Sequence, residues 1–375
     1  MADTPEEKPI AAPDRDSRPP GPLRKGWTTG ACAAAAARAA CEGLLTGRFP
    51  DPVAIVLPQG QRPSFALAGT ERGGDWAMAG VIKDAGDDPD VTHGALVLAR
   101  VRAGTPQSGV TFRAGEGVGT VTRPGLALAV GEPAINPGPR AMIARAIADA
   151  IDHCGGASDF EVTVAIPGGE QLAAKTLNAR LGIVGGLSIL GTTGIVVPFS
   201  CSAWIHSIHR GIDVARAAGL DHVAAATGST SEAAVKAMYD LSDTALIDMG
   251  DFVGGTLKYL RRHGVPWLTI AGGFGKLAKL AAGHLDLHSA RSRVDIGALG
   301  ALLGELGASV ATVARANEAA SAGEVLALAE AHGVKLADAV ARRAREVTLA
   351  ALAGGTSVDV VVFDRGGRLI GRAGP

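Results

Sequence analysis

The pattern of apolar and polar positions changes its rhythm about halfway along the chain. In the first half, a helical stretch over residues 28–45 is followed by strand-like segments at 53–57, 95–103 and 161–166. A second helical stretch, ending near residue 153, lies between the last two of these strands. Because strands and helices mix irregularly here, the pattern is typical of an α+β domain.

From about residue 183 the alternation becomes regular. Short apolar strands are separated by longer amphipathic helices, which predicts βαβ units around a parallel sheet. The expected helices and strands occupy, in order, residues 203–218, 222–226, 231–241, 245–249, 252–263, 267–271 and 275 onward. Alanine-rich helices up to residue 353 and a last strand at 358–363 complete the pattern.

We therefore expect an α/β chain with three parts. Residues 1–22 are rich in proline and charge and predict a disordered tail. Residues 23–182 form the expected α+β domain. Residues 183–375 form the expected doubly wound, mostly parallel-sheet domain, which resembles a Rossmann fold and has a helical C-terminal part.

The first helix carries unusual boundary and interior signals. Thr28 or Thr29 can cap its start, and Gly47 is placed to end it. Its interior, ACAAAAARAAC, has almost no large side chains. Such a helix can lie very close to a neighbouring sheet, and it would hold the Thr-Thr-Gly turn at its start rigidly in place. Alanine is also the best intrinsic helix former, so simple packing explains the same run.

Composition and charge exclude several classes of protein. The chain has 375 residues, 47% of them hydrophobic, and a formal net charge of −1, so it lacks the strong positive field of a general nucleic-acid binder. No apolar run reaches the roughly 18 residues that a membrane helix needs. The four cysteines are scattered without a CxxC pair, which argues against a zinc ribbon or a disulfide scaffold. We expect a cytoplasmic protein that binds neither nucleic acid nor membrane.

Three loops at the ends of the predicted parallel strands share one character. Each places glycine or a small hydroxyl residue where a helix begins, at residues 226–231, 249–254 and 271–276. Ligands of open α/β sheets bind at this edge, and helix starts attract anions. The spacing matches neither a dinucleotide fingerprint nor a Walker loop. Ordinary strand-to-helix turns explain any one of these loops, whereas three in succession favour a pocket.

Two further stretches attract attention. Residues 190–194, LGTTG, repeat the Thr-Thr-Gly turn of the first helix, and we hypothesise that the two turns clasp one ligand. The loop at 83–94 concentrates aspartates beside His93; it lacks the full EF-hand pattern, so carboxylates that cap amides and hold Lys83 are the more ordinary interpretation. Basic side chains gather in later loops and would suit a ligand with several carboxylates.

Taken together, the motifs LRKGWTTGACAAAAARAA, VIKDAGDDPDVTHG, INPGPR, LNARLGIVGGLSILGTTGIV and GKLAKLAAGHLDLHS run in order over nearly the whole chain after the tail. In this combination the chain resembles the cobalt-precorrin-5B C(1)-methyltransferase family of cobalamin biosynthesis. The resemblance implies transfer of a methyl group from S-adenosylmethionine to carbon 1 of a tetrapyrrole, giving cobalt-precorrin-6A. Because the cobalt belongs to the substrate, the resemblance implies no metal ligand in the protein.

The family motifs also single out site residues. The substrate-binding candidates are Thr28, Thr29, Gly30, Lys83, Asn136, Arg140, Arg180, Thr192, Thr193, Lys276 and His288. Among these, Lys83, Arg140 and Arg180 are expected to meet substrate carboxylates. The candidates for a catalytic role are Asp84, Asp87 and Asp88, which would orient Lys83 or assist proton movement.

We place the methyl donor at the strand ends of the second domain. Thr227, Gly228 and Asp251 are the cofactor-binding candidates, with Asp251 accepting hydrogen bonds from ribose hydroxyls. Two other functions stay open at this point: a small-molecule kinase with a non-Walker phosphate loop, and a non-catalytic tetrapyrrole carrier. A homo-oligomer is also allowed by the sequence.

Overall fold

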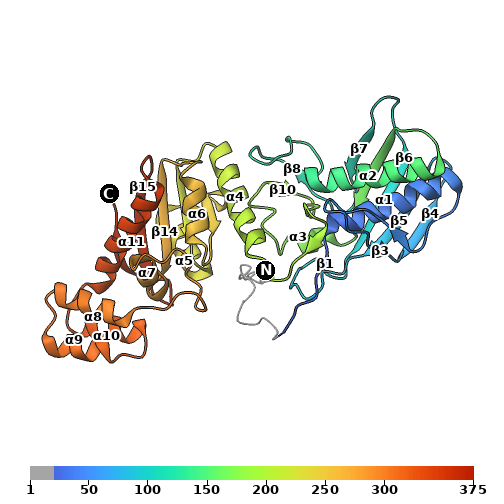
Figure 1. The fold of residues 1–375 in the computed structure, drawn as a ribbon. Helices are drawn as coiled ribbons and strands as arrows, with labels where there is room; N and C mark the ends of the chain where they lie inside the picture. The colour runs from blue at the N-terminus through green and yellow to red at the C-terminus, as the bar shows by residue number, and fades with distance from the viewer. Residues whose placement is uncertain (1–20) are drawn as a thin grey trace, which may run out of the picture. The chain divides into compact units, whose positions relative to one another are not determined.

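The structure, a computed structural model, describes residues 21–375 (Figure 1). The tail expected at residues 1–22 lies, apart from its last two residues, outside this part of the chain. By their internal contacts the described residues form two compact units, the first ending at Ser200 and the second starting at Cys201. Each unit is described by itself.

The boundary between the units lies later than the expected division after residue 182. Strand β10 (Ile183–Val184) pairs with β8 (Thr120–Val121), and β11 (Ile195–Val196) pairs with β1 (Gly26–Trp27). Both short strands therefore stay with the first unit, because their hydrogen-bond partners belong to it.

The first unit is built on a five-stranded sheet of order β4-β5-β6-β9-β7, in which all neighbours are antiparallel except β9 and β7. A separate pair, β2 with β3, and the short helix α3 lie outside this sheet. The bounds are β2 (Val53–Ala54), β3 (Ser64–Phe65), β4 (Gly69–Arg72), β5 (Trp76–Ile82), β6 (Leu96–Ala103), β7 (Val110–Ala114), β9 (Phe160–Ala165) and α3 (Gly169–Ala173).

Helix α1 (Thr29–Thr46) is buried over most of its length, from Thr29 to Gly43 with the exception of Arg38. It contacts β5 and β6 and also helix α2 (Pro137–Cys154), which runs beside it in Figure 1. Every residue over the run Ala31 to Ala37 has 0% of its surface exposed. Alanines make this possible, because larger side chains would hold the helix away from its neighbours. As expected from the sequence, Thr28 caps the helix, and Gly47, with φ at 77°, ends it.

The second unit is the expected doubly wound sheet, of order β13-β12-β14-β15-β16. The first four of these strands are parallel, and β16 adds an antiparallel edge. Its strands are β12 (His222–Ala226), β13 (Leu246–Asp248), β14 (Trp267–Gly273), β15 (Ser357–Phe363) and β16 (Leu369–Ala373).

Helices cover both faces of this sheet. Helices α4, α6, α7 and α11 share one apolar core with it, and α5 packs on the opposite face. Helices α8, α9 and α10 form a further group, drawn in orange in Figure 1. The bounds are α4 (Cys201–Ala217), α5 (Ser229–Tyr239), α6 (Val253–Leu260), α7 (Phe274–Ala281), α8 (Ile296–Glu305), α9 (Val310–Asn317), α10 (Ala322–Ala331) and α11 (Leu336–Leu352), with a 3-10 turn at Asp243–Ala245.

The strand order creates a switch point between β12 and β14. From β12 the chain moves to β13 on one side and then returns to place β14 on the other side. At such a point the loops that follow the two strands diverge to opposite faces, which leaves a crevice at the carboxyl edge of the sheet. No helix over residues 21–375 has both the length and the apolar character that crossing a membrane requires.

The packing of α1 predicts that Ala35→Leu is destabilising. A leucine there has no space between the sheet and α2, and such overpacking costs about 1–3 kcal/mol. The measurement is the midpoint of thermal unfolding. Ala301→Leu on α8 is the matched control, because Ala301 is exposed and should tolerate the change. An unchanged midpoint for the Ala35 variant would contradict tight packing of α1.

Candidate functional site

The two Thr-Thr-Gly turns of the first unit contact each other. The backbone N–H of Thr28 donates to the Gly194 carbonyl at 2.9 Å, and that of Gly30 donates to the Leu190 carbonyl at 3.1 Å. Gly191, with φ at 115°, lies so close that a Cβ there would be 2.4 Å from the Thr28 side chain. Only glycine fits this position.

These contacts use the donors that an anion would need. The Ala31 N–H donates to Thr28 Oγ1 at 3.2 Å, and the N–H groups of Thr28 and Gly30 are paired with the second turn. Thr29 is buried, and the Thr193 hydroxyl bonds to the Ile195 backbone. While the turns stay together, the start of α1 offers few open donors to the anion that the sequence suggests there.

The Asn-Pro-Gly-Pro-Arg motif meets the same loop from the side of α2. The Asn136 N–H donates to the Ile189 carbonyl at 3.1 Å, and a Cβ on Gly138 would lie 3.2 Å from the Gly191 carbonyl oxygen. Arg140 is expected to bind substrate, but its Nε donates to the Ile135 carbonyl at 2.7 Å and its Nη2 pairs with Glu132 at 3.1 Å. Its guanidinium holds the turn that precedes α2.

Lys83 is the most buried charged side chain of the aspartate-rich loop. Only 2% of its surface is exposed, and its ammonium contacts Asp90 and Thr92. The contact with Lys83 lowers the pKa of Asp90, although burial alone would raise it. The family resemblance assigns Lys83 to substrate carboxylates, whereas the structure pairs it with a carboxylate of its own loop, as the more ordinary interpretation of this loop expects.

The carboxylates of Asp84, Asp87 and Asp88 all contact the chain itself. The Arg24 guanidinium donates to Asp84 and lowers its pKa to about 2. The Arg24 N–H donates to Asp87 at 2.6 Å, and the Phe199 N–H donates to Asp88 at 2.8 Å. Burial raises the pKa of Asp88. These side chains fasten the loop to the segments on either side of the Thr-Thr-Gly pair.

The remaining candidates of the first unit differ in exposure. Thr192 is exposed, and Arg180 is partly exposed and makes contacts of its own. Asn178, which the sequence does not single out, is buried; its Nδ2 donates to the Gly186 carbonyl at 3.1 Å and its Oδ1 accepts from Ser188. Asn178 lies within the LNARLG motif, and this position is the feature of the sequence that could have identified it as a structural residue.

At the carboxyl edge of the second unit, all three cofactor-binding candidates lie on loops that follow parallel strands. Thr227 and Gly228 follow β12, and Asp251 follows β13. A Cβ on Gly228 or Gly273 would meet nothing within 4 Å, so these glycines border open space. The helices that begin here, α5, α6 and α7, have no side-chain cap, in contrast to α1.

Lys276 and Asp251 meet at this edge. The Lys276 ammonium donates to the Thr227 carbonyl at 2.7 Å and lies 3.0 Å from Asp251 Oδ1. That oxygen is buried and has no hydrogen bond, because the ion pair does not have hydrogen-bond geometry. The charge of Lys276 holds this buried oxygen, and the rest of the Asp251 side chain, which is 21% exposed, is the part that a ligand hydroxyl can reach.

The motif GKLAKLAAGHLDLHS contributes further residues to the same edge. Lys279 is buried and donates to the Leu287 carbonyl at 2.8 Å, and burial lowers its pKa. The Leu287 N–H donates to the Asp251 carbonyl at 3.0 Å. His288 accepts from the Ala290 N–H through Nδ1. Of the substrate-binding candidates, only Lys276 and His288 belong to the second unit.

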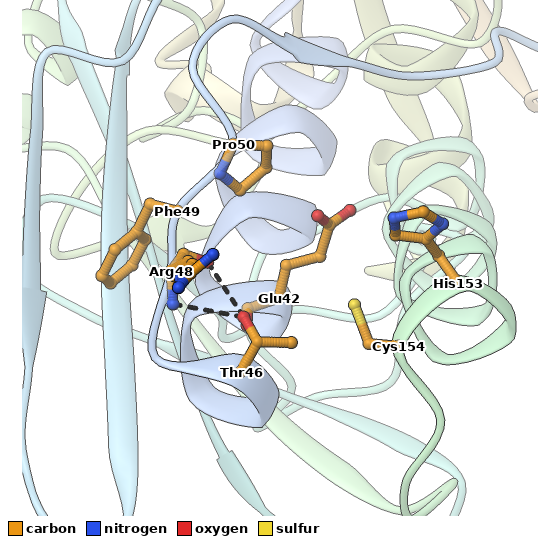
Figure 2. Close-up of a pocket in the computed structure, with 7 residues that line it drawn as sticks. All are labelled: Glu42, Thr46, Arg48, Phe49, Pro50, His153 and Cys154. Atoms are coloured by element: carbon orange, nitrogen blue, oxygen red, sulfur yellow. Dashed lines mark hydrogen bonds between the residues drawn. The ribbon is translucent and has the colours of Figure 1, made fainter.

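A cavity of about 510 Å³ opens in the first unit where α1 and α2 end (Figure 2). It lies at the opposite end of α1 from the Thr-Thr-Gly turn, and no candidate residue lines it. Its lining residues are Glu42, Thr46, Arg48, Phe49, Pro50, His153 and Cys154. Glu42 accepts from Arg38 at 2.9 Å, and burial raises the pKa of Cys154. Over residues 21–375, no group of three or more His, Cys, Asp or Glu side chains is arranged to hold a metal.

The second unit has a doubly wound sheet whose carboxyl edge carries a carboxylate and glycines that border open space. This arrangement is typical of α/β domains that bind small molecules. Comparison with known proteins narrows this class. Residues 16–198 match the family described as CbiD, and residues 286–374 match CbiD, C-terminal domain. The chain belongs to the CbiD family, as the resemblance in sequence predicts.

Several curated relatives carry the name cobalt-precorrin-5B C(1)-methyltransferase. The protein from Paramagnetospirillum magneticum is 60% identical over 94% of this chain and 98% of its own. The protein from Bradyrhizobium sp. is 62% identical over 94% of both chains. A crystal structure of a cobalamin biosynthesis protein (cbiD) from Archaeoglobus fulgidus is 27% identical, covers 67% of this chain and 77% of that one, and has a TM-score of 0.39.

The buried ion pair predicts a structural role for Lys83. Lys83→Met leaves Asp90 without its cation and should destabilise the protein by about 1–3 kcal/mol. Asp90→Asn should do the same, and the double variant should lose less than the sum of the two, because each change breaks one shared contact. Urea unfolding of the four proteins measures this. If the losses of the two single variants simply added in the double variant, Lys83 and Asp90 would not stabilise the protein through a shared contact.

Proposed function

We propose that the chain methylates carbon 1 of cobalt-precorrin-5B, with S-adenosylmethionine as methyl donor and cobalt-precorrin-6A as product. The observation that carries this proposal is the 60% identity, over 94% of the chain, to a relative named for this C(1)-methylation. Identity of this degree across nearly the full length of both proteins supports a shared activity and a place in cobalamin biosynthesis.

We assign the methyl donor to the carboxyl edge of the second unit. The switch point between β12 and β14, the glycines Gly228 and Gly273 that border open space, and the partly exposed Asp251 carboxylate support this assignment. A partly exposed carboxylate is a suitable acceptor for the hydroxyl groups of a ribose. Glycine at the loop ends lets an adenine or ribose approach the backbone closely.

The chemistry places few demands on acids or bases. When bound, S-adenosylmethionine supplies a methyl group activated by its sulfonium. The chain then has to hold the accepting carbon in line with that methyl and exclude water, so positioning supplies most of the rate enhancement. A reaction that needs no acid or base is consistent with the contacts of Asp84, Asp87 and Asp88, which hold parts of the first unit together.

For the tetrapyrrole, we propose contact with the loop at 190–197 of the first unit. Thr192 is exposed there, between Leu190 and Val197, whose surfaces are 50% and 51% exposed. Apolar side chains around a hydroxyl suit the flat face of a macrocycle. Lys83 and Arg140 would have to break their present contacts to reach substrate carboxylates, so we propose that they shape this surface instead.

A mass assay tests the activity. The purified chain, incubated with S-adenosylmethionine and cobalt-precorrin-5B, should add one methyl group to the tetrapyrrole and release adenosylhomocysteine. Tetrapyrrole that binds but keeps its mass would overturn the proposal and favour a carrier. Turnover of ATP in place of methyl transfer would favour a kinase. A cytoplasmic location and a homo-oligomer stay predictions from the sequence.

The cofactor site predicts the effect of Asp251→Asn. Replacing the carboxylate weakens the acceptor for ribose hydroxyls, and we expect adenosylhomocysteine to bind about tenfold more weakly. Calorimetric titration measures this affinity. Asp221→Asn is the control, because Asp221 is exposed and precedes β12 at the opposite edge of the sheet. Equal affinity of wild type and the Asp251 variant would remove Asp251 from the site.

A further inference from the structure

We propose that Lys276 is a positioning residue, which aims the Asp251 carboxylate at the ribose of the methyl donor. The resemblance in sequence assigns Lys276 to the tetrapyrrole instead. The inference rests on the cofactor site proposed above, and it concerns how that site is held in place.

The position of Lys276 in the fold supports this role. It stands in the first turn of α7, directly after β14, yet its ammonium reaches the loop after β12 through the Thr227 carbonyl and the loop after β13 through Asp251. One cation therefore joins the three loops that border the crevice at the switch point. A displaced Lys276 would release two of them at once.

The other contacts of Asp251 leave its side chain dependent on Lys276. Its backbone carbonyl accepts from Leu287, which fixes the main chain but not the carboxylate. Lys279, the next lysine of α7, is 8% exposed and donates to the Leu287 carbonyl. Its charge acts on Asp251 at longer range, whereas the Lys276 ammonium lies 3.0 Å from Asp251 Oδ1. The carboxylate side chain is 21% exposed and that of Lys276 is 40% exposed.

Charge explains what the ion pair does. Opposite charge draws the Asp251 carboxylate toward the Lys276 ammonium, and without that cation the side chain would be free to rotate toward water. The ion pair therefore fixes the direction of the carboxylate. Oδ1 itself is buried beside the ammonium, so the part of the side chain that stays exposed is what a ligand donor reaches.

The test compares two ligands on several variants by calorimetric titration. The ligands are adenosylhomocysteine and its analogue without the 2′ and 3′ hydroxyls. Wild type should prefer the intact ribose about tenfold. Lys276→Met should abolish this preference while the weaker ligand still binds as before, and Lys276→Arg should restore most of it. Lys258→Met is the matched control, because Lys258 is an exposed lysine on the neighbouring helix α6.

The outcomes separate this role from its alternatives. Lys276→Met added to Asp251→Asn should cause no further loss, because both changes act through one carboxylate. Equal weakening of both ligands would instead indicate loosened loops and overturn the positioning role. An unchanged preference in Lys276→Met would overturn it too, while leaving the cofactor site intact. If wild type bound no adenosylhomocysteine, the cofactor site itself would fail, and this role with it.

Discussion

The burial of α1 between a sheet and a second helix is the constraint on which the first unit depends. A helix that touches a sheet and a second helix at once has room for methyl side chains and little else, and the run of alanines meets that demand. Because α1 and α2 lie so close, both of their starts meet the loop at 190–194. Glycines at 30, 138 and 191 fit where these segments converge, because a Cβ at each would lie 3.2 Å or less from its nearest neighbour.

Helix α1 and the helices of the candidate binding edge satisfy their starts in different ways. In the first unit the chain supplies its own acceptors to α1, through the Thr28 hydroxyl and the Leu190 carbonyl. In the second unit, α5, α6 and α7 begin without side-chain caps around open glycines. Backbone N–H groups that are hydrogen-bonded within the chain make the start of a helix rigid. Backbone N–H groups without such partners can instead bind a ligand. This difference distinguishes the start of α1 from the candidate binding edge.

Much of the second unit could be predicted from sequence, because buried parallel strands and amphipathic helices alternate with clear periods. The strands β4, β5 and β7 escaped prediction: β5 contains Gly80, which packs against Leu98, and β7 has partly exposed residues. The pairing of β10 and β11, each two residues long, depends on partners far away in the chain, and no local pattern reports it.

The candidate site shows the same limit. The sequence predicts that Thr227, Gly228 and Asp251 lie on one edge of the sheet, because each follows a parallel strand. This prediction needs only the order of strands and helices along the chain. The Lys276 contact with Thr227 depends instead on β14 lying next to β12, which the sequence does not state. Likewise, the sequence shows several aspartates around Lys83 but not that Asp90 is the one that pairs with it.

The strand order has a consequence for how the second unit is divided. The match to the C-terminal family domain begins at residue 286, whereas the folded unit begins at Cys201. A fragment cut at residue 286 would keep β15 and β16 but lose β14, the neighbour that covers the other edge of β15. β15 is apolar, with Val358, Val360 and Val362 on one of its faces, and the bare backbone edge of an apolar strand recruits further strands. Such a fragment would tend to aggregate, although it contains the whole of the recognised domain.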